Sequence, residues 1–407
     1  MSISNYTLDQ KFIKEVLGLD GAVILDQKEY KDGILLDVRM EGKPHSCPEC
    51  GCKKTHVHDH RKRVVYAALI NGTRVWIRID RRRFRCTSCE KRFYEEVPFL
   101  MRYQRITLSV RNQLFESLGG STLSVTDLSR FLGLSPACVR RYIDLFSPDS
   151  KPLPRVMGID EFRGNAGGQK YQVILTDLEN GEVVDILEGV NSKRLADYFN
   201  SRPDRDSVEI ISMDLSNLFR SVAKSCFPQA QIVADRFHLH RSVLWSMERV
   251  RKSEQKHLGV RFRKFFKHSR KILYKRYENL SDREREALAV MFSYSPSLKR
   301  AWMLKESFFS ILDLRDEQLV RSALGQWIKV VEDFDEKEFL GNVATIRSWL
   351  EPVVASVFSV YSNGFTEGVN NKIKVLKRCA YGVRRMDRFR TRIMLSVNIK
   401  RGAKLAV

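Results

Sequence analysis

The sequence predicts a multidomain α/β protein, in which two small modules precede a larger domain of mixed strands and helices. Two Cys-x-x-Cys pairs flank a predicted β-hairpin near the N-terminus, and short capped helices follow them. Beyond residue 150, β-branched strand segments alternate with stretches of helical periodicity. The chain has 407 residues, which is enough for roughly two to four domains.

The composition indicates a cytoplasmic protein with a polyanionic partner. The net charge is +22, and 43% of the residues are hydrophobic. So large a positive charge favours nucleic acid as the partner, although a basic but otherwise ordinary protein is the alternative. No apolar run approaches the ~18 residues of a membrane span, and the N-terminus lacks the pattern of a signal peptide. Eight cysteines in a cytoplasmic chain favour metal binding or core positions over disulfides.

Four cysteines have the pattern of a zinc site. Two Cys-x-x-Cys pairs supply four thiolates, the set that tetrahedral zinc prefers. The 35 residues between the pairs exceed the usual spacing of about 15–20. A hairpin that turns at Asn71-Gly72 explains the excess, because it brings the pairs together. We therefore predict a zinc-ribbon-like finger that binds Zn²⁺ through Cys47, Cys50, Cys86 and Cys89.

The second strand of this hairpin is a candidate nucleic-acid surface. Its apolar residues alternate with basic and aromatic ones, and a run of arginines follows. Basic residues with an interleaved aromatic suit contacts to phosphates and DNA grooves, whereas a solvated basic face is the competing interpretation. The candidate DNA contacts are Arg74, Trp76, Arg78, Arg81, Arg82 and Arg83.

A helical module is predicted next. A helix over residues 108–118 precedes two shorter helices, which Ser124 and Ser135 cap and a glycine turn separates. A short helix, a glycine turn and a capped second helix form the helix-turn-helix pattern, in which the second helix reads DNA. Arg140 and Arg141 lie in that second helix and are further candidate DNA contacts.

Three predicted strands of the following domain end on aspartates. The first ends on Asp160, and the two strands of a later βαβ unit end on Asp214 and Asp235. An antiparallel meander followed by βαβ units is the ribonuclease-H-like order. This order places the first and fourth strands side by side, so Asp160 and Asp214 should be neighbours. Each aspartate could instead cap a helix or begin a turn.

A helix that begins near residue 364 supplies a further candidate carboxylate. One face carries Glu367, Asn371, Lys374 and Arg378, which suits a metal ion at its start and phosphates along it. A glutamate that offsets the helix dipole is the alternative. Three carboxylates at one sheet edge would bind Mg²⁺, which prefers oxygen ligands. Two such ions can activate an attacking oxygen and stabilise a leaving one, so the expected substrate is a phosphodiester.

The segment between the βαβ unit and this helix is helical and strongly basic, and we interpret it as an insertion into the core. It contains four tryptophans, most of which we expect to be buried. The predicted divisions are an N-terminal α/β segment (1–44), the zinc finger (45–100), the helix-turn-helix domain (101–150), the first part of the catalytic core (151–240), the insertion (241–354), and the last core helix with a tail (355–407).

The motifs resemble those of DDE transposases of bacterial insertion sequences, specifically the ISL-three family. The resemblance covers nearly the whole chain and rests on CPECG, RRRFRCTSCEKRF, GIDEF, ISMD, FPQAQIVADRFHL and SNGFTEGVNNKIKVLKRCAYG. It implies a ribonuclease-H-like core that cuts and joins transposon ends with Mg²⁺ or Mn²⁺. It also implies that the zinc finger and helix-turn-helix read terminal inverted repeats, and that synapsis of two ends requires a homodimer or larger assembly. By this resemblance, Asp160 and Glu367 are the first and last acidic ligands.

The sequence leaves alternatives open for the second metal ligand and for the activity of the protein. Topology favours Asp214 as the second ligand, and Asp235 is its rival. A DNA-binding regulator on an inactive transposase scaffold would need the N-terminal modules but not the carboxylates, so Asp160, Asp214 and Glu367 argue against it. A structure-specific nuclease of the same fold would have less use for sequence-reading modules. We therefore predict a transposase.

Overall fold

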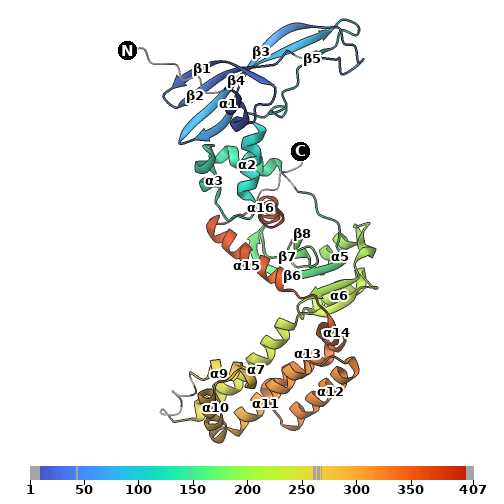
Figure 1. Ribbon diagram of the computed structural model, residues 1–407. Coiled ribbons are helices and arrows are strands. Elements are labelled where there is room, and N and C mark those ends of the chain that lie inside the picture. The colour runs from blue at the N-terminus through green and yellow to red at the C-terminus, as the bar shows by residue number, and fades with distance from the viewer. Residues whose placement is uncertain are drawn as a thin grey trace. The chain divides into compact units, whose positions relative to one another are not determined.

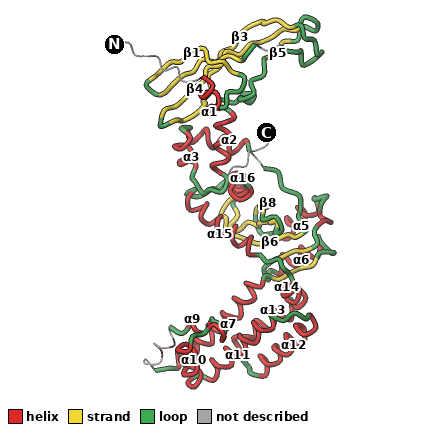
Figure 2. Tube along the Cα trace, viewed as in Figure 1, coloured by secondary structure: helices red, strands yellow, loops and turns green. Residues whose placement is uncertain are grey.

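The computed structural model describes residues 10–42, 45–146, 148–259, 263, 266 and 268–399 (Figure 1). The chain divides into two compact units: the first unit contains residues up to 149 and from 372 onward, and the second unit contains residues 150–371. None of the described helices combines the length and hydropathy that crossing a membrane requires. The named strands lie in two sheets, and helices make up much of the remainder (Figure 2).

The first unit opens with one helix and a five-stranded sheet. Its elements are α1 (Gln10–Leu17), β1 (Ala22–Tyr30), β2 (Gly33–Met40), β3 (Thr55–Ile70), β4 (Thr73–Cys86) and β5 (Arg92–Tyr94). The strand order is β1-β2-β4-β3, and β5 also pairs with β4. β2 is parallel to β4, whereas the other pairs are antiparallel. The N-terminal strands and the cysteine-bearing hairpin therefore form one sheet.

The predicted hairpin of β3 and β4 is confirmed, and it is longer than expected. Asn71 and Gly72 adopt φ values of 49° and 80°, the left-handed conformations that such a tight turn requires. On β4, Val75, Ile77 and Ile79 face the core as predicted and are at most 5% exposed. Pairing continues to the opposite end of the hairpin, where the last residue of β4 is a cysteine.

Four helices of the described part of the first unit lie outside α1 and the helix that spans both units. They are α2 (Leu108–Leu118), α3 (Val125–Leu132), α4 (Pro136–Leu145) and α16 (Met386–Asn398). The predicted caps are present, because the Ser124 and Ser135 hydroxyls accept from backbone amides of α3 and α4. Gly133 ends α3 with φ of 66°, a conformation that glycine adopts without strain.

The C-terminal helix α16 belongs to this helical cluster. Leu395 shares a buried core with α2, α3 and α4, and Arg388 donates two hydrogen bonds of 2.5 and 2.6 Å to Asp144 of α4. The sequence predicts a last core helix and a C-terminal tail over residues 355–407. The division between the compact units falls within α15 (Gly364–Cys379), and α16 buries its apolar face against α2 and α4.

The second unit contains the other sheet. Its strands are β6 (Val156–Ala166), β7 (Gln169–Asp177), β8 (Glu182–Glu188), β9 (Ile210–Met213) and β10 (Gln231–Ala234), in the order β10-β9-β6-β7-β8. β6, β7 and β8 form an antiparallel meander, whereas β9 is parallel to β6 and β10 is parallel to β9. Helix α5 (Ser192–Asn200) connects β8 toward β9, and α6 (Asn217–Cys226) connects β9 to β10.

The prediction that the first strand of this sheet ends on Asp160 is wrong. β6 continues to Ala166, because it keeps its pairing with β7 and its alternation of buried and exposed residues. The parallel partner β9 does stop at this level, since its last residue, Met213, pairs with Ile159. Asp160 and Asp214 each follow this last parallel pair and therefore lie side by side, as the strand order predicted.

A helical segment follows β10. It contains α7 (Arg236–His257), α9 (Arg270–Tyr274), α10 (Asp282–Tyr294), α11 (Pro296–Ile311), α12 (Glu317–Asp333), α13 (Leu340–Ser348) and α14 (Leu350–Phe358). α7 packs on α11, and α14 packs on β10. Sheet and helices share one hydrophobic core that includes Ile159, Met213 and Trp327. The helical segment is therefore an extension of the domain that carries the aspartates.

Candidate functional sites

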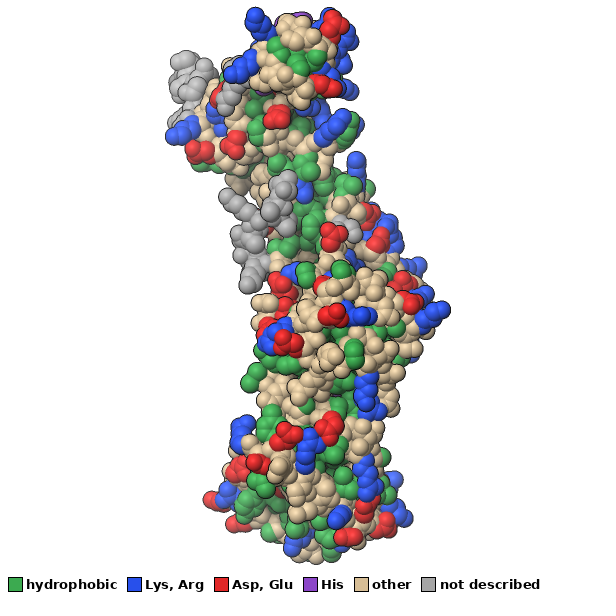
Figure 3. Space-filling model, turned by 90° about the vertical axis from the view of Figure 1, so that its right-hand side faces the viewer, with side chains coloured by type: hydrophobic (Ala, Val, Ile, Leu, Met, Phe, Trp, Pro, Cys, Tyr) green, Lys and Arg blue, Asp and Glu red, His purple; other side chains and the backbone are tan. Residues whose placement is uncertain are grey.

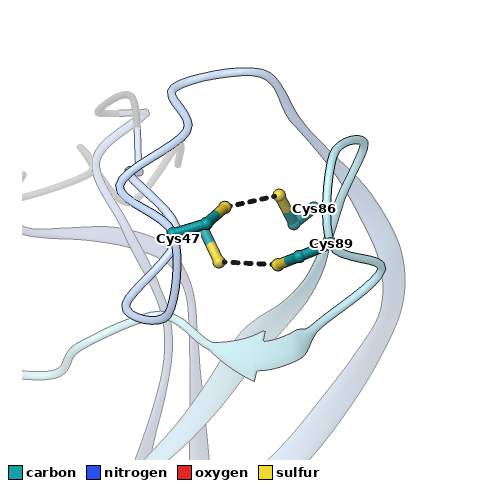
Figure 4. Close-up of side chains that lie close together, drawn as sticks. Cys47, Cys86 and Cys89 are labelled. Carbon is teal, nitrogen blue, oxygen red and sulfur yellow. Dashed lines mark hydrogen bonds between the residues drawn. The ribbon is translucent and has the colours of Figure 1, made fainter.

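The four predicted zinc ligands come together in the first unit. Cys47 and Cys50 lie in the turn before β3, Cys86 ends β4, and Cys89 lies in the turn before β5. The four Sγ atoms lie within 4.8 Å of one another, with Cys47–Cys89 and Cys50–Cys86 separations of 3.5 and 3.6 Å (Figure 4). Tetrahedral Zn–S bonds of about 2.3 Å imply S···S distances near 3.8 Å, so the cluster fits Zn²⁺.

The pKa values of the four thiols are shifted in opposite directions. Hydrogen bonds from the backbone, chiefly that of Cys50, lower the pKa of the Cys47 thiol to about 7. The backbone at Cys89 and Ser88 likewise lowers the pKa of Cys86. Both effects favour the thiolate, which is the form that binds zinc. Backbone hydrogen bonds act on Cys50 and Cys89 as well, but contacts with neighbouring thiols and burial raise the pKa of both. Cys52 is not part of the cluster, and its Sγ atom accepts a 3.1 Å hydrogen bond from Ser88.

Asp160 forms the centre of a second site, at the edge of the β6–β9 pair. Its side chain is 8% exposed, and burial together with the charge of Asp214 raises its pKa to about 7. One carboxylate oxygen accepts a 2.7 Å hydrogen bond from the Glu161 amide, and the other accepts one of 2.7 Å from Asn370 Nδ2. Burying a carboxylate next to a second carboxylate is unfavourable unless a cation or a proton neutralises the pair.

The helix α15 is fixed to the sheet beside this carboxylate. Thr366 on α15 is fully buried, and its hydroxyl lies 2.7 Å from that of Thr176 on β7. This approach requires glycine at position 158, because a Cβ there would lie 2.4 Å from the Thr176 hydroxyl and 2.8 Å from that of Thr366. Glu367 is the next residue. It is half-buried, and its side chain has no hydrogen bond or ion pair within the part of the chain that the structure describes.

Glu367 lies one turn before the residue of α15 that contacts Asp160, and the described part of the chain does not group its carboxylate with other possible metal ligands. Positions three residues apart on a helix share a face, so Glu367 lies one turn before Asn370, whose amide contacts Asp160. The sequence analysis placed Asn371 on this face, but Asn371 is exposed and Asn370 is buried. Each residue turns a helix by about 100°, so adjacent asparagines differ greatly in direction, and hydrophobic periodicity alone did not separate them.

Asp214, Asp235 and His238 form a compact group next to Asp160. Asp235 caps α7 by accepting from the Phe237 amide at 3.0 Å, and its second oxygen lies 2.9 Å from His238 Nδ1. The same Nδ1 atom lies 3.0 Å from Asp214 Oδ1. Asp214 and Asp235 together raise the pKa of His238 to about 9, so the imidazole is protonated at neutral pH. The sequence analysis missed His238, although its position three residues after a strand-end aspartate is a usable signal.

Two buried oxygen atoms in this region lack hydrogen-bond partners. Asp214 Oδ1 is buried without a partner of hydrogen-bond geometry, although it lies 3.0 Å from His238 Nδ1 in an ion pair. Asn370 Oδ1 is also buried without a partner. Unsatisfied buried oxygens beside a raised-pKa carboxylate are the donor set that a hard divalent cation prefers. The residues present therefore fit Mg²⁺ or Mn²⁺.

Comparison with known proteins identifies the family. The family model for ISL3 transposases, described as "Transposase", matches residues 157–393. The zinc finger of the IS204/IS1001/IS1096/IS1165 transposases matches residues 43–89. The chain belongs to the ISL3 family of transposases. Its second unit thus holds most of the transposase match, and its cysteine cluster is the family's zinc ribbon.

Two curated relatives and one solved structure are similar to this chain. The transposase is 24% identical over 398 residues to the transposase of IS1001 from Bordetella parapertussis, which covers 94% of this chain and 97% of the relative. It is 25% identical over 258 residues to the transposase of IS1557 from Mycobacterium tuberculosis, 56% of this chain and 57% of that one. The structure of the Drosophila P element transposase strand transfer complex matches with a TM-score of 0.40 and 11% identity, covering 72% of this chain and 92% of that chain.

The candidate DNA contacts of the transposase have different surroundings. On the face drawn in Figure 3, Lys and Arg side chains are interspersed with Asp and Glu. On β4, Arg78 pairs with Asp37, Arg82 pairs with the buried Glu95 at 2.8 Å, and Arg83 lies 3.4 Å from Asp59. Arg74 donates to the Gly133 carbonyl at 3.3 Å, and Trp76 is half-buried with its ring 5.1 Å from that of Tyr66. The exposed candidates are Arg140 and Arg141 on α4 and Lys374 and Arg378 on α15.

Proposed function

We propose that this transposase binds the terminal inverted repeats of an insertion sequence and catalyses metal-dependent DNA strand cleavage and strand transfer. The observation that carries the proposal is that Asp160 and Asp214 lie side by side, just after the last residue pair of β6 and β9. Two buried oxygens at this place, Asp214 Oδ1 and Asn370 Oδ1, have no hydrogen-bond partner in the described part of the chain. The strand order β10-β9-β6-β7-β8 supports a ribonuclease-H-like core with residues 241–354 as its helical insertion.

In this proposal Asp160, Asp214 and Glu367 hold Mg²⁺ or Mn²⁺. The bound ions would supply Lewis-acid activation of the attacking oxygen and charge stabilisation at the leaving oxygen. Asn370 holds one Asp160 oxygen by its amide, which fixes the direction of the carboxylate. His238 contacts Asp235 at the start of α7 and places a positive charge against Asp214.

DNA recognition would use the first unit. The predicted helix-turn-helix corresponds to α3 and α4, and the exposed Arg140 and Arg141 lie on α4, its second helix. The zinc ribbon would supply further phosphate contacts. Cutting two transposon ends in one complex requires two copies of the catalytic unit, so we expect a homodimer or larger assembly on DNA.

Substitutions at two neighbouring aspartates test the assignment of the second ligand. Asp214→Asn should reduce cleavage of duplexes carrying the element's own ends by about 1,000-fold or more, because it removes a metal ligand. Asp235→Asn should retain measurable cleavage, because asparagine caps a helix as well as aspartate does. Cleavage and end binding would be measured for both variants and the wild type with Mg²⁺ and with Mn²⁺.

The opposite pattern, with Asp235→Asn inactive and Asp214→Asn active, would move the ligand to Asp235. A wild-type protein that binds the ends but cuts them with neither metal would favour the DNA-binding regulator. Cleavage of branched or flapped DNA without regard to the terminal sequence, and without joining, would favour the structure-specific nuclease.

We propose that one of the four tryptophans of the insertion, Trp245, contacts DNA. Trp327 and Trp349 are at most 3% exposed and Trp302 packs against the core, whereas Trp245 on α7 is 50% exposed. Arg241 lies between Trp245 and the exposed Phe237, 4.8 and 5.5 Å from the two ring centroids. This aromatic–arginine–aromatic row begins two residues after Asp235, beside the proposed metal site, and its flat faces suit stacking with unpaired bases.

Trp245→Ala should weaken the reaction at a transposon end. Base–aromatic stacking contributes about 1–3 kcal/mol, so we expect roughly a 5- to 150-fold loss of cleavage or of binding to pre-nicked ends. Trp245→Phe preserves a stacking face and should recover most of the loss. Binding and single-turnover cleavage would be compared on flush and pre-nicked ends. Equal activity of Trp245→Ala and wild type on both substrates would exclude the stacking role.

A further inference from the structure

A basic hollow of about 660 Å³ lies on the first unit, and among the candidate DNA contacts predicted on β4 it includes Arg81 alone. β3, β4 and the segment before α2 supply its charged lining. The lining contains six cationic side chains and no carboxylate. They are Arg61, Lys62, Arg63, Arg81, Arg102 and Arg105.

The charge in this hollow is only partly offset within the protein, since the charge of Glu95 acts against the burial that lowers the pKa of Arg81. In the part of the chain that the structure describes, none of the six cations forms an ion pair. Neighbouring cations do: Arg39 pairs with Asp80 at 2.7 Å, and Arg85 pairs with Glu90 at 2.6 Å. Six unpaired positive charges around one concavity create a local field that favours an anion with several charges.

Two of the cations are held in place by the fold. Arg63 donates to the Gln104 carbonyl, and Arg81 donates to the Glu95 carbonyl at 2.8 Å while stacking 5.0 Å from the Tyr94 ring. Partial burial lowers the pKa of both guanidinium groups, and the charges of Arg105 and Arg61 lower that of Arg63 further. These shifts show like charges held together and partly withdrawn from water, an arrangement that a bound anion would relieve.

The remaining cations surround these two. Arg61, Arg102 and Arg105 are exposed, and Arg102 lies 4.9 Å from the ring of Tyr103. Tyr103 also lines the hollow, is 73% exposed, and holds a φ of 63° in the left-handed region. Fixed arginines at the base and extendable arginines at the rim match an extended polyanion better than a single small ion, because successive phosphates can each find a donor.

We propose that this hollow binds consecutive phosphates of one strand of duplex DNA and so anchors the zinc-ribbon sheet on the transposon end. The proposal rests on DNA as the partner in the proposed function. It adds a site that includes Arg61, Arg63, Arg102 and Arg105 and that reads the backbone rather than the bases. The contact is therefore independent of sequence.

The test is the salt dependence of DNA binding by the full-length, zinc-loaded protein. Arg102→Gln/Arg105→Gln removes two cations of the hollow, and Arg39→Gln/Arg85→Gln is the matched control, with the same charge change at paired arginines of the same sheet. Each lost phosphate contact lowers the slope of log affinity against log salt by about 0.9, so the first variant should lose about 1.8. We expect its affinity to fall on the order of ten- to a hundredfold at moderate salt.

The duplexes would be one that carries the element's end and an unrelated one of the same length. A phosphate site predicts the same loss on both, with an unchanged slope for the control variant. Three outcomes would overturn the site while the proposed function stands. The slope could be unchanged in Arg102→Gln/Arg105→Gln, the control variant could lose as much slope, or the loss of affinity could be confined to the element's end. A wild-type protein that binds neither duplex would overturn both. Zinc content and thermal melting confirm that each variant is folded.

Discussion

Asp160→Asn should abolish DNA cleavage and yet give a protein that is more stable than the wild type in the absence of divalent metal. The substitution removes a proposed metal ligand, so cleavage of the element's ends should fall by about 1,000-fold or more. It also removes a buried negative charge next to Asp214. In the metal-free protein the two carboxylates repel each other, and this repulsion destabilises the folded state. End cleavage with Mg²⁺ and thermal unfolding with EDTA would be measured on the same preparations.

The direction of the stability effect follows from the pKa of Asp160. Folding raises that pKa from 3.8 to about 7, so the folded state binds a proton that the unfolded state releases. Wild-type stability therefore falls as the pH rises from about 4 to 7, and the full penalty is present above pH 7. Asparagine has no such penalty, and at pH 8 the variant should be more stable by on the order of 2 kcal/mol.

A control carboxylate in the same unit should behave in the opposite way. Although burial raises the pKa of Asp204, hydrogen bonds from Arg202 and from the Leu153 amide lower it below its ordinary value. Asp204→Asn should therefore destabilise the protein at pH 8. Mg²⁺ should raise the melting temperature of the wild type but not that of Asp160→Asn. If Asp160→Asn were less stable than the wild type at pH 8 in EDTA, Asp160 would stabilise the fold without metal. It would then be a structural carboxylate rather than a metal ligand.

The proximity of Asp160 and Asp214 was predictable because it depends on strand order alone. A short parallel pair with a fixed register places the residues after its last pair side by side, whatever the surrounding loops do. The hairpin through Asn71-Gly72 was predictable for a similar reason, since the turn residues determine which strands pair. In both cases the information is local in sequence or follows from a topological rule.

The contacts of Asp160 and Asp214 could not be predicted in the same way. Whether Asn370 or Asn371 reaches Asp160 depends on the rotation of α15, which the buried Thr366–Thr176 contact fixes across almost 200 residues of sequence. His238 lies on α7, and its contact with Asp214 depends on how that helix packs beside the end of β9. Tertiary packing determines both contacts. An amphipathic pattern predicts which face of a helix is buried, but not which residues pack against that face.

The charges of β4 illustrate the same limit. The alternation of Arg74, Trp76 and Arg78 correctly indicated the face opposite the core, but it said nothing about partners. Arg78 meets Asp37 of a parallel neighbour, and Trp76 packs beside Tyr66 of the adjacent strand. The basic hollow joins Arg81 of β4 to arginines on β3 and in the segment before α2, which no sequence motif connects.

Cys86→Ser should remove the zinc ion and weaken DNA binding without unfolding the whole first unit. Structural zinc contributes roughly 10–16 kcal/mol in small finger peptides, more than the end of a hairpin can replace. The buried core of the sheet, which includes Leu36, Val65 and Ile77, contains none of the four cysteines. We therefore expect amide exchange to accelerate at the cysteine turns and β5, while the opposite end of β3 and β4 stays protected.

The matched control for this prediction is Cys52→Ser. Cys52 lies in the same turn region and contacts Ser88, but its sulfur is outside the cluster, so this variant should keep one zinc ion per chain and bind DNA as the wild type does. Zinc content, hydrogen exchange and affinity for the element's end would be measured for both variants. Tyr94 of β5 stacks on Arg81 in the basic hollow, so disorder of β5 should weaken the phosphate contacts even on unrelated DNA. If the zinc-free Cys86→Ser protein bound DNA with normal affinity, the zinc ribbon would not contribute to DNA binding. The role in DNA binding would then belong to α3 and α4.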